Sequence, residues 1–335
     1  MAETNHHEGP ALVTGASGFI GRHLVRALLR QNRRVLALCR SLRDLQGLEH
    51  PLFRVIHGDL EEPQSYAAHL NDQVTVFHLA ATRNSPGTSP ERLHRINVEA
   101  CLDLGRVSVK ARIAKFVYVS TATVFGPSKV GSVTEDDGYC RHTLKSIYLR
   151  SKVRALVQMG KLLESGLPLV TVCPTIVFGP DHPTHPNRVT SYLRRLLRSR
   201  LDLVVGGGHR RRNLVYVDDA VRGMLLAERS GGLGEEYILG GEEISHRELN
   251  RTVLSLAGRK PRLRLSIPVT LARATAKVAD RLRGYDRGTG YETALEMLTK
   301  EWEFSSQKAE NMLGYTPMPL RDTIRQTLRF VEGAN

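Results

Sequence analysis

A glycine-punctuated turn near the N-terminus constrains the fold of this chain most strongly. Residues 11–24 read ALVTGASGFIGRHL, in which Gly15, Gly18 and Gly21 follow a short apolar run and precede an apolar-periodic segment. A strand-to-helix turn needs glycine where φ is positive, where backbone N–H groups approach a pyrophosphate, and where the helix packs tightly on the strand. The N-terminus of the following helix also favours an anion. Many βα turns are glycine-rich, but the position directly after the first expected strand favours a dinucleotide site.

Strand and helix patterns alternate after this turn, as is typical of parallel βαβ units. The strands are continuous apolar runs, which indicates burial on both faces of a sheet. Expected strands cover 10–14, 34–39, 53–57, 74–80, 115–120 and 168–172, and a further strand is expected at 214–217. Expected helices cover 19–31, 91–110 and 146–165. The sequence therefore predicts an α/β fold with a Rossmann-type doubly wound parallel sheet.

The length of 335 residues exceeds the size at which single cores usually stop growing, so two domains are expected. Beyond Cys173 the pattern becomes irregular, with a Pro/Gly/His-rich loop, a basic helix and a glycine run. We expect a nucleotide-binding domain of residues 1–172 plus 212–232. A smaller, mostly helical C-terminal substrate domain is expected to comprise 173–211 plus 233–335.

Several sequence features favour a cytoplasmic protein without integral membrane contact. No apolar run approaches the roughly 18 residues that a membrane span needs. The first ten residues, MAETNHHEGP, lack the apolar and basic regions of a signal peptide. The four cysteines form no C-x-x-C pair, which fits reduced thiols.

A net charge of +14 is the one unusual property of the composition. Such a charge fits nucleic acid, an anionic membrane surface, an acidic substrate or cofactor, or simply arginine-rich helix faces in water. No zinc-finger spacing or aromatic-interleaved basic patch indicates nucleic acid, and we expect none as a partner. Basic residues cluster at 188–212 and 259–264, in the half that is expected to face a substrate.

The helix expected after the fifth strand carries the residues that indicate chemistry. Tyr148 and Lys152 stand four positions apart in YLRSK, which places their side chains on one helix face. A nearby ammonium stabilises a phenolate and so makes tyrosine a better general acid or base. Thr121, just past the fifth strand in VSTATVFG, adds a hydroxyl where strand ends of such folds meet a ligand.

These motifs together resemble the extended short-chain dehydrogenase/reductases, a group within the NAD-dependent epimerase/dehydratase superfamily. TGASGFIG, HLAA, RINVEA, STATVFG and YLRSK occur in the order seen in that family, and CPTIVFGP, NLVYVDDA and the C-terminal EWEFSSQKAENMLGYTP are also similar. The pattern is most similar to 3β-hydroxysteroid dehydrogenases and dihydroflavonol reductases. The resemblance implies that the two domains bind NAD(P) and substrate respectively.

The resemblance also implies a cofactor site. The glycine turn would hold the pyrophosphate, Asp59 and Leu60 would flank the adenine, and 174–177 would pass beside the nicotinamide. The residues expected to bind the cofactor are Gly15, Ser17, Gly18, Phe19, Ile20, Gly21, Arg40, Asp59, Leu60, Ala80, Ala81, Tyr148, Lys152, Pro174, Ile176 and Val177. Arg40 ends the second expected strand, where arginine suits a 2′-phosphate and an acidic residue would suit NAD. NADP(H) is therefore favoured, with NAD(H) as the other candidate.

The implied catalytic residues are Thr121, Tyr148 and Lys152. Tyr148 would move the proton at the reacting oxygen, Lys152 would lower its pKa and hold the nicotinamide ribose, and Thr121 would hydrogen-bond the same oxygen. The family more often has serine at the position of Thr121, and threonine keeps the hydroxyl. Expected substrate contacts are Thr82, Thr123 and Arg212. Asn97 either orders the active-site region or caps a neighbouring backbone.

Other polar residues have simpler structural explanations. His78 lies on an expected buried strand and is interpreted as a core histidine. Asp218 and Asp219 stand where a strand passes into a helix, which favours an N-cap. His182 and His185 have no carboxylate or cysteine at metal-site spacing, so no metal is expected.

The sequence therefore predicts an NAD(P)-dependent oxidoreductase, acting as a ketone or aldehyde reductase or as a secondary-alcohol dehydrogenase. A nucleotide-sugar 4-epimerase and a non-catalytic cofactor-binding relative remain as alternatives. Cys173 stands where nucleotide-sugar members usually carry asparagine, and Ala122 and Thr123 replace the acidic pair of the sugar dehydratases. Arg212 matches a phosphate-binding arginine of the nucleotide-sugar enzymes and equally suits a carboxylate. We expect a small carbonyl or alcohol substrate, lipophilic or anionic, and a homodimer.

Overall fold

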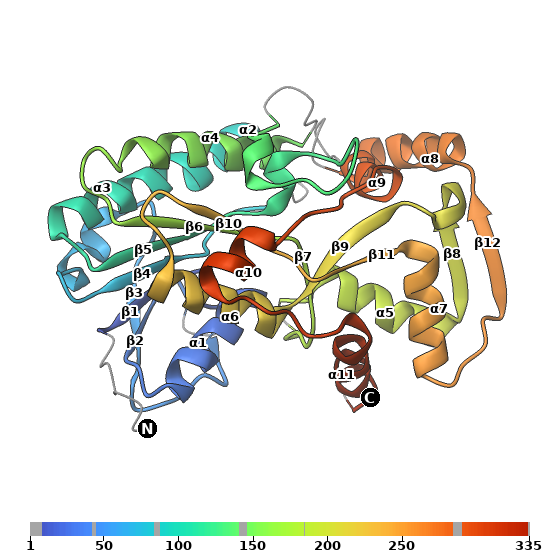
Figure 1. The fold of residues 1–335 in the computed structure, drawn as a ribbon, viewed down its shortest axis with the longest axis horizontal. Helices are drawn as coiled ribbons and strands as arrows, with labels where there is room; N and C mark the ends of the chain where they lie inside the picture. The colour runs from blue at the N-terminus through green and yellow to red at the C-terminus, as the bar shows by residue number, and fades with distance from the viewer. Residues whose placement is uncertain are drawn as a thin grey trace.

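A seven-stranded parallel sheet organises the first two thirds of the chain in the computed structural model, which describes residues 9–41, 45–83, 88–140, 146–183, 185–283 and 290–333 (Figure 1). The strand order is β10-β6-β5-β4-β1-β2-β3, and every neighbouring pair is parallel. The strands are β1 (Ala11–Thr14), β2 (Val35–Cys39), β3 (Phe53–His57), β4 (Thr75–His78), β5 (Lys115–Val119), β6 (Leu169–Pro174) and β10 (Glu236–Leu239). The predicted doubly wound sheet is confirmed.

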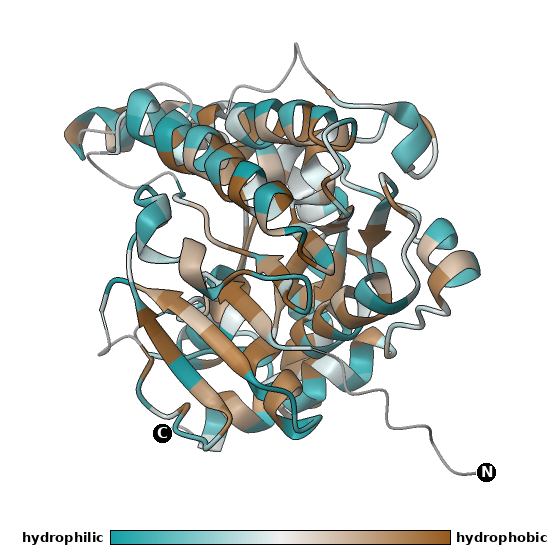
Figure 2. Cartoon of the chain, turned by 90° about the vertical axis from the view of Figure 1, so that its left-hand side faces the viewer, coloured by the Kyte–Doolittle hydropathy of each residue, from teal (hydrophilic) through white to brown (hydrophobic). Residues whose placement is uncertain are grey.

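Helices cover both faces of this sheet because its strands are apolar on both sides. Leu12 of β1 packs into one buried cluster with residues of α3 and α4, and the next residue, Val13, packs into the other with residues of α1 and α6. The helices are α1 (Phe19–Arg30), α2 (Pro90–His94), α3 (Cys101–Ala111), α4 (Ile147–Lys161), α6 (Val217–Ser230) and α10 (Gln307–Leu313). Figure 2 shows the apolar strands lying between the helical layers.

The helix expected over 91–110 is interrupted by a wider turn. α2 passes into a π-helical segment, Arg95–Ala100, before α3 begins. Short 3-10 turns occur at Pro63–Ser65, Ala67–His69, Ala122–Phe125, Glu135–Asp137 and Gly206–Gly208. π segments of this kind are frequent at functional sites, and this one carries Asn97.

The remaining part contains two small sheets in addition to helices. One has the order β11-β9-β7 and the other pairs β12 with β8. These strands are β7 (Ile176–Phe178), β8 (Leu201–Val205), β9 (Arg211–Tyr216), β11 (Glu242–Ser245) and β12 (Leu263–Ile267). The helices here are α5 (Arg188–Ser199), α7 (His246–Leu256), α8 (Val269–Leu282), α9 (Tyr291–Thr299) and α11 (Leu320–Gly333). The helical C-terminal region agrees with expectation, whereas the strands other than β9 were not predicted.

The expected domain division stays a prediction, and strand pairing crosses it at two places. β10 lies beyond residue 233 but pairs with β6 in the large sheet. β9 lies within 212–232 for most of its length but pairs with β7 and β11. Among the described residues, no helix is both long and apolar enough to cross a membrane.

Gly21 provides a test of how α1 is attached to β1. A Cβ at Gly21 would lie 2.1 Å from the carbonyl oxygen of Gly15, whereas a Cβ at Gly160 in α4 meets nothing within 4 Å. We predict that Gly21→Ala lowers the free energy of unfolding because backbone must move, and that Gly160→Ala raises it by up to about 1 kcal/mol because alanine is the better helix former. Denaturant unfolding of both variants measures this. Equal stability of Gly21→Ala and the unchanged protein would contradict the packing described.

Candidate active site

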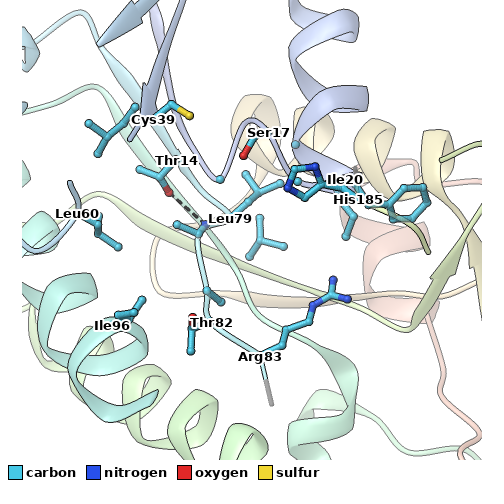
Figure 3. A pocket seen from close by; sticks show the side chains of 18 of the residues that line it. Thr14, Ser17, Ile20, Cys39, Leu60, Leu79, Thr82, Arg83, Ile96 and His185 are labelled. Carbon is cyan, nitrogen blue, oxygen red and sulfur yellow. Dashed lines mark hydrogen bonds between the residues drawn. The ribbon is translucent and has the colours of Figure 1, made fainter. Parts of the chain in front are cut away.

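A cavity of about 480 Å³ opens at the carboxyl ends of the central strands (Figure 3). It lies where β1 has β2 on one side and β4 on the other, the point at which the strand order reverses. Ligands of open α/β sheets bind at such a switch point. The cavity is lined by the glycine turn, by residues at the ends of β2, β3, β4 and β5, and by α4.

The glycine turn fits a pyrophosphate. Gly15 has a φ of 71°, and a Cβ there would lie 2.8 Å from the backbone nitrogen of Ala80. Gly18 caps α1 without a side-chain hydrogen bond, and the first turn of α1 holds no acidic residue. Its backbone N–H groups are thus available to an anion at the positive end of the helix. The residues present therefore suit the phosphates of NAD(P).

Arg40 and Asp59 line one end of the cavity. Arg40 follows β2, and its Nη1 atom lies 3.8 Å from Oδ2 of Asp59, which follows β3. The Arg40 side chain is 70% exposed, so this long ion pair leaves its donors accessible to a ligand. Oδ1 of Asp59 accepts a hydrogen bond from the backbone of Glu61 at 3.0 Å, which fixes the carboxylate.

Tyr148 and Lys152 line the other end of the cavity. Both stand on α4, whose start is fixed by the Ser146 hydroxyl accepting from the backbone of Leu149. Lys152 is buried, and its Nζ donates to the carbonyl of Val119 at 3.0 Å. The four-residue spacing has therefore placed a phenol and an ammonium together in one cavity, as the sequence predicted.

Buried aromatic residues pack against Lys152. Its Nζ lies 3.4 Å from the Tyr118 hydroxyl and 4.8 Å from the centre of that ring. His78 stacks on Tyr118, and its Nδ1 lies 2.7 Å from the Thr14 hydroxyl. Burial, reinforced by the charge of Lys152, lowers the pKa of His78 to about 3. His78 is thus a neutral, hydrogen-bonded core histidine, and the positive charge at this place belongs to Lys152.

Asn97 fulfils both of the roles considered for it. From the π-helical segment, its Oδ1 accepts from the backbone nitrogen of Thr82 at 2.7 Å and its Nδ2 donates to the carbonyl of Thr82 at 2.9 Å. The same Nδ2 donates to the Ser151 hydroxyl at 3.0 Å. Asn97 caps a neighbouring backbone and thereby joins the cavity wall at Thr82 to α4, between Tyr148 and Lys152.

The cavity contains most but not all of the residues predicted to bind ligand. Every predicted cofactor residue lines it except Pro174, Ile176 and Val177, and Thr82 lines it as well. Thr121 and Thr123 do not line it: their hydroxyls lie 2.9 Å apart, and Thr121 caps the following 3-10 turn. The roles proposed for the predicted residues remain predictions.

Several lining residues were not predicted. They are Arg83, Ile96, Ser120, His185 and Pro186, among others at the strand ends. Figure 3 shows Arg83 and His185 reaching the cavity from different segments. Arg83 follows the HLAA motif by two residues, so the motif's position could have indicated it. No sequence signal indicates that His185 lines the cavity, because its loop is held there by contacts between residues that are far apart in the chain.

His23 makes one of those distant contacts. Its Nε2 lies 2.9 Å from the carbonyl oxygen of Pro180, and its Nδ1 lies 2.8 Å from Oδ1 of Asp218 at the start of α6. The histidine thus links α1, directly after the glycine turn, to the loop that carries His185. Asp218 serves this link, whereas Asp219 receives the Arg222 guanidinium and the backbone N–H of Met318. Neither aspartate caps α6 with its side chain, so the expected N-cap is wrong.

A second polar cluster surrounds Arg212 on β9, outside the cavity. Arg212 is half-buried, its buried Nε has no hydrogen-bond partner among the described residues, and the same holds for Nε1 of the neighbouring Trp302. His246 nearby lies 2.8 Å from the Tyr192 hydroxyl. Burial and the charge of Arg212 lower the pKa of His246 to about 4, so Arg212 is the cation of this cluster at neutral pH. Its buried, unpaired Nε is suited to an anionic group.

Comparison with known proteins agrees with this geometry. Residues 11–240 match the NAD dependent epimerase/dehydratase family. The chain is 28% identical to a 3-beta-hydroxysteroid dehydrogenase of Mycolicibacterium neoaurum, over 77% of this chain and 73% of that protein. It is 27% identical to a 2-alkyl-3-oxoalkanoate reductase of Stenotrophomonas maltophilia, over 91% and 94%. A crystal structure of UDP-glucuronic acid 4-epimerase from Bacillus cereus in complex with NAD superposes with a TM-score of 0.77 at 23% identity, over 96% of both chains.

The family match covers more than half of the chain and includes the glycine turn, Tyr148, Lys152 and the strands that bring them together. The relatives named here are, by name, a dehydrogenase, a reductase and an epimerase. The predicted resemblance to the extended short-chain dehydrogenase/reductases is thus confirmed. This chain is an enzyme and belongs to the NAD dependent epimerase/dehydratase family.

Proposed function

We propose that this enzyme is an NADP(H)-dependent oxidoreductase that interconverts a ketone or aldehyde with the corresponding alcohol. One observation carries the proposal: Tyr148 and Lys152 lie in the same cavity as a glycine turn that suits a pyrophosphate. The bound cofactor supplies the hydride. The protein must then hold the substrate carbonyl beside the cofactor and move one proton at its oxygen.

Tyr148 is the proposed proton donor in the direction of reduction. Its phenol protonates the oxygen that becomes the alcohol, and the same group accepts that proton in the reverse reaction. The ammonium of Lys152 favours the phenolate that remains, because a nearby positive charge stabilises the charged form of an acid. Lys152 already donates to the Val119 carbonyl at 3.0 Å, so its charge is held at the strand end.

Thr121 is the proposed second hydrogen-bond partner of the substrate oxygen. Its hydroxyl is hydrogen-bonded to the hydroxyl of Thr123, and Thr121 does not line the cavity. The role therefore requires the Thr121 hydroxyl to exchange its bond to Thr123 for one to the substrate. Hydrogen bonds in ligand-free sites are often made to other partners and rearrange in the complex.

The preference for NADP(H) rests on Arg40. The guanidinium is accessible and has only a long ion pair to Asp59, so it can bind a 2′-phosphate with its planar set of donors. NAD(H) remains the alternative, because Asp59 lines the same end of the cavity and can accept from a ribose hydroxyl.

The proposed substrate is a small lipophilic or anionic carbonyl compound. The chain matches most of the length of a hydroxysteroid dehydrogenase and of an oxoalkanoate reductase. This similarity supports a reductase with a lipophilic substrate. Arg212, with its unpartnered Nε, supports an anionic group such as a carboxylate. We further propose Thr82, Thr123 and Arg212 as substrate contacts, and a homodimer in the cytoplasm as the working form.

A nucleotide-sugar 4-epimerase is the second candidate, and Arg212 is the observation that favours it. A half-buried guanidinium with an unpartnered Nε also suits a diphosphate. Cys173, which is buried on β6, speaks against this function, because a thiol is a poor partner for a sugar phosphate. The presence of both Tyr148 and Lys152 in the cavity speaks against a non-catalytic relative.

Tyr148→Phe tests the proposed proton donor. We expect loss of turnover with cofactor binding retained, because only the hydroxyl is removed and the glycine turn is untouched. Lys152→Ala should lower both kcat and cofactor affinity. Steady-state kinetics and fluorescence titration with NADPH measure the two effects, and Tyr291→Phe on α9 is the matched control. A near-normal kcat for Tyr148→Phe would refute the assignment.

Arg40→Ala tests the cofactor preference. The substitution removes the partner of the 2′-phosphate and should lower kcat/KM for NADPH by roughly tenfold or more, with little effect for NADH. Arg54→Ala is the control, because Arg54 is an exposed arginine on the adjacent strand β3 and does not line the cavity. A clear preference of the unchanged enzyme for NADH would contradict the proposal.

Titration calorimetry with UDP and dTDP separates the two candidate functions. A carbonyl reductase should show no micromolar binding of either nucleotide. Micromolar binding that disappears in Arg212→Ala would instead identify a nucleotide-sugar site and replace the reductase with the epimerase.

A further inference from the structure

The C-terminal part of the chain carries a concentration of exposed apolar side chains. Among the large apolar residues that the described part of the chain exposes, most lie on three connected elements, β8, β12 and α8. These side chains, which we call the apolar face, are Leu201, Leu203, Leu263, Leu265, Leu271, Val278 and Leu282. Single exposed leucines are ordinary on a protein surface, but a contiguous group indicates an interaction site.

The β8–β12 sheet brings four of these leucines together. The parallel register sets Leu263 beside Leu201 and Leu265 beside Leu203. Residues two apart on a strand share one side of the sheet, so all four side chains lie on the same side. Each is between 39% and 50% exposed.

The opposite side of this sheet is covered by α7. Val204 is buried there, and Asn250 of α7 donates to Oδ1 of Asp202 at 2.7 Å. These two strand residues alternate with the leucines, so they point the other way. Among the residues described, α7 therefore packs on the polar side of the sheet and leaves the leucine side open.

α8 covers only the far end of the leucine side. Its Ala272 and Ala276 pack against Val205 and Ile267, which continue the same side of β8 and β12. These contacts attach the start of α8 to the carboxyl end of the leucine side, so the exposed leucines of the sheet and the exposed side chains of α8 belong to one region of the molecule.

The solvent-exposed side of α8 carries an apolar stripe. Leu271, Val278 and Leu282 are seven and four residues apart, which places them in one stripe along the helix. They are 54%, 59% and 82% exposed. Such a stripe on a helix that already buries another side against its own protein has no intramolecular function in the described structure.

Cations border this apolar face. Arg273, Lys277 and Arg281 are exposed and follow one another at four-residue spacing on α8. The segment 259–283 contains eight lysines and arginines and one acidic residue, Asp280, so its net charge of +7 is half of the chain's +14. Arg264 lies on the α7 side of the sheet, where its Nε is 3.6 Å from Oδ2 of Asp202, so the cations that border the apolar face are those of α8.

We propose that the apolar face docks the enzyme on an anionic lipid bilayer surface. Leucines and valine would enter the boundary of headgroups and acyl chains, and the bordering lysines and arginines would contact anionic headgroups. A second copy of this chain is disfavoured as the occupant, because two such basic borders would repel one another. The face also contains none of the aromatic side chains that usually anchor protein interfaces. This proposal concerns membrane association and does not depend on the reaction proposed above.

Sedimentation of the 335-residue chain with vesicles tests the proposal. We expect binding to vesicles of phosphatidylcholine mixed with phosphatidylglycerol, weaker binding at higher salt, and little binding to phosphatidylcholine alone. Absence of binding to the anionic vesicles would overturn the proposal.

Two triple variants separate the apolar from the electrostatic contribution. Leu271→Ser/Val278→Ser/Leu282→Ser and Arg273→Gln/Lys277→Gln/Arg281→Gln should each weaken vesicle binding by roughly tenfold or more. Their side chains are exposed, so stability should change little, which thermal unfolding checks.

The matched controls carry the same kinds of substitution elsewhere. Leu233→Ser removes a 63% exposed leucine, and Arg34→Gln/Arg54→Gln/Lys110→Gln removes three exposed cations of the large-sheet region. Both should bind vesicles like the unchanged protein. Equal losses in the control and test variants would show adsorption through overall charge and would overturn the proposal. Self-association that is lost with the leucine variant, without vesicle binding, would assign the face to a second copy instead.

Discussion

Close backbone contact at the start of the chain is the constraint on which the site depends. Gly21 lies against the carbonyl of Gly15, and Gly15 lies against the backbone of Ala80, so α1, β1 and β4 meet without space for a side chain. This contact fixes the N-terminus of α1 at the point where the strand order reverses. A phosphate held there would have its position set by backbone atoms rather than by side chains.

At the other end of the cavity, side-chain contacts position the lining residues. Asn97 stands on a wide π-helical turn and binds both the backbone of Thr82 and the hydroxyl of Ser151. Ser151 is the residue before Lys152, so the turn holds α4 at a defined place relative to β4. Tyr118, with neutral His78 stacked on it, closes the space behind the ammonium. The glycine turn and the ammonium of Lys152 therefore face one cavity.

The parts of the site that follow from local pattern were predictable from the sequence. The glycine turn can be recognised from its spacing alone, and Tyr148 and Lys152 from their spacing on a helix. Because parallel strands bring their carboxyl ends to one edge of the sheet, these residues were expected at the same edge. His185 was missed because its loop reaches the cavity through the long-range bonds of His23. β12 was missed because its exposed leucines alternate with Arg264 and Ser266 and its partner β8 is distant in sequence.

A substrate screen that follows NADPH absorbance tests the assignment as an oxidoreductase most directly. Lipophilic ketones, 3-oxo acids and nucleotide sugars would be offered in parallel, with Tyr148→Phe as the blank. We expect stoichiometric consumption of NADPH with at least one ketone or oxo acid, absent in the variant, and no change in any nucleotide sugar, as the assignment requires. Interconversion of a nucleotide sugar without net consumption of cofactor would contradict it.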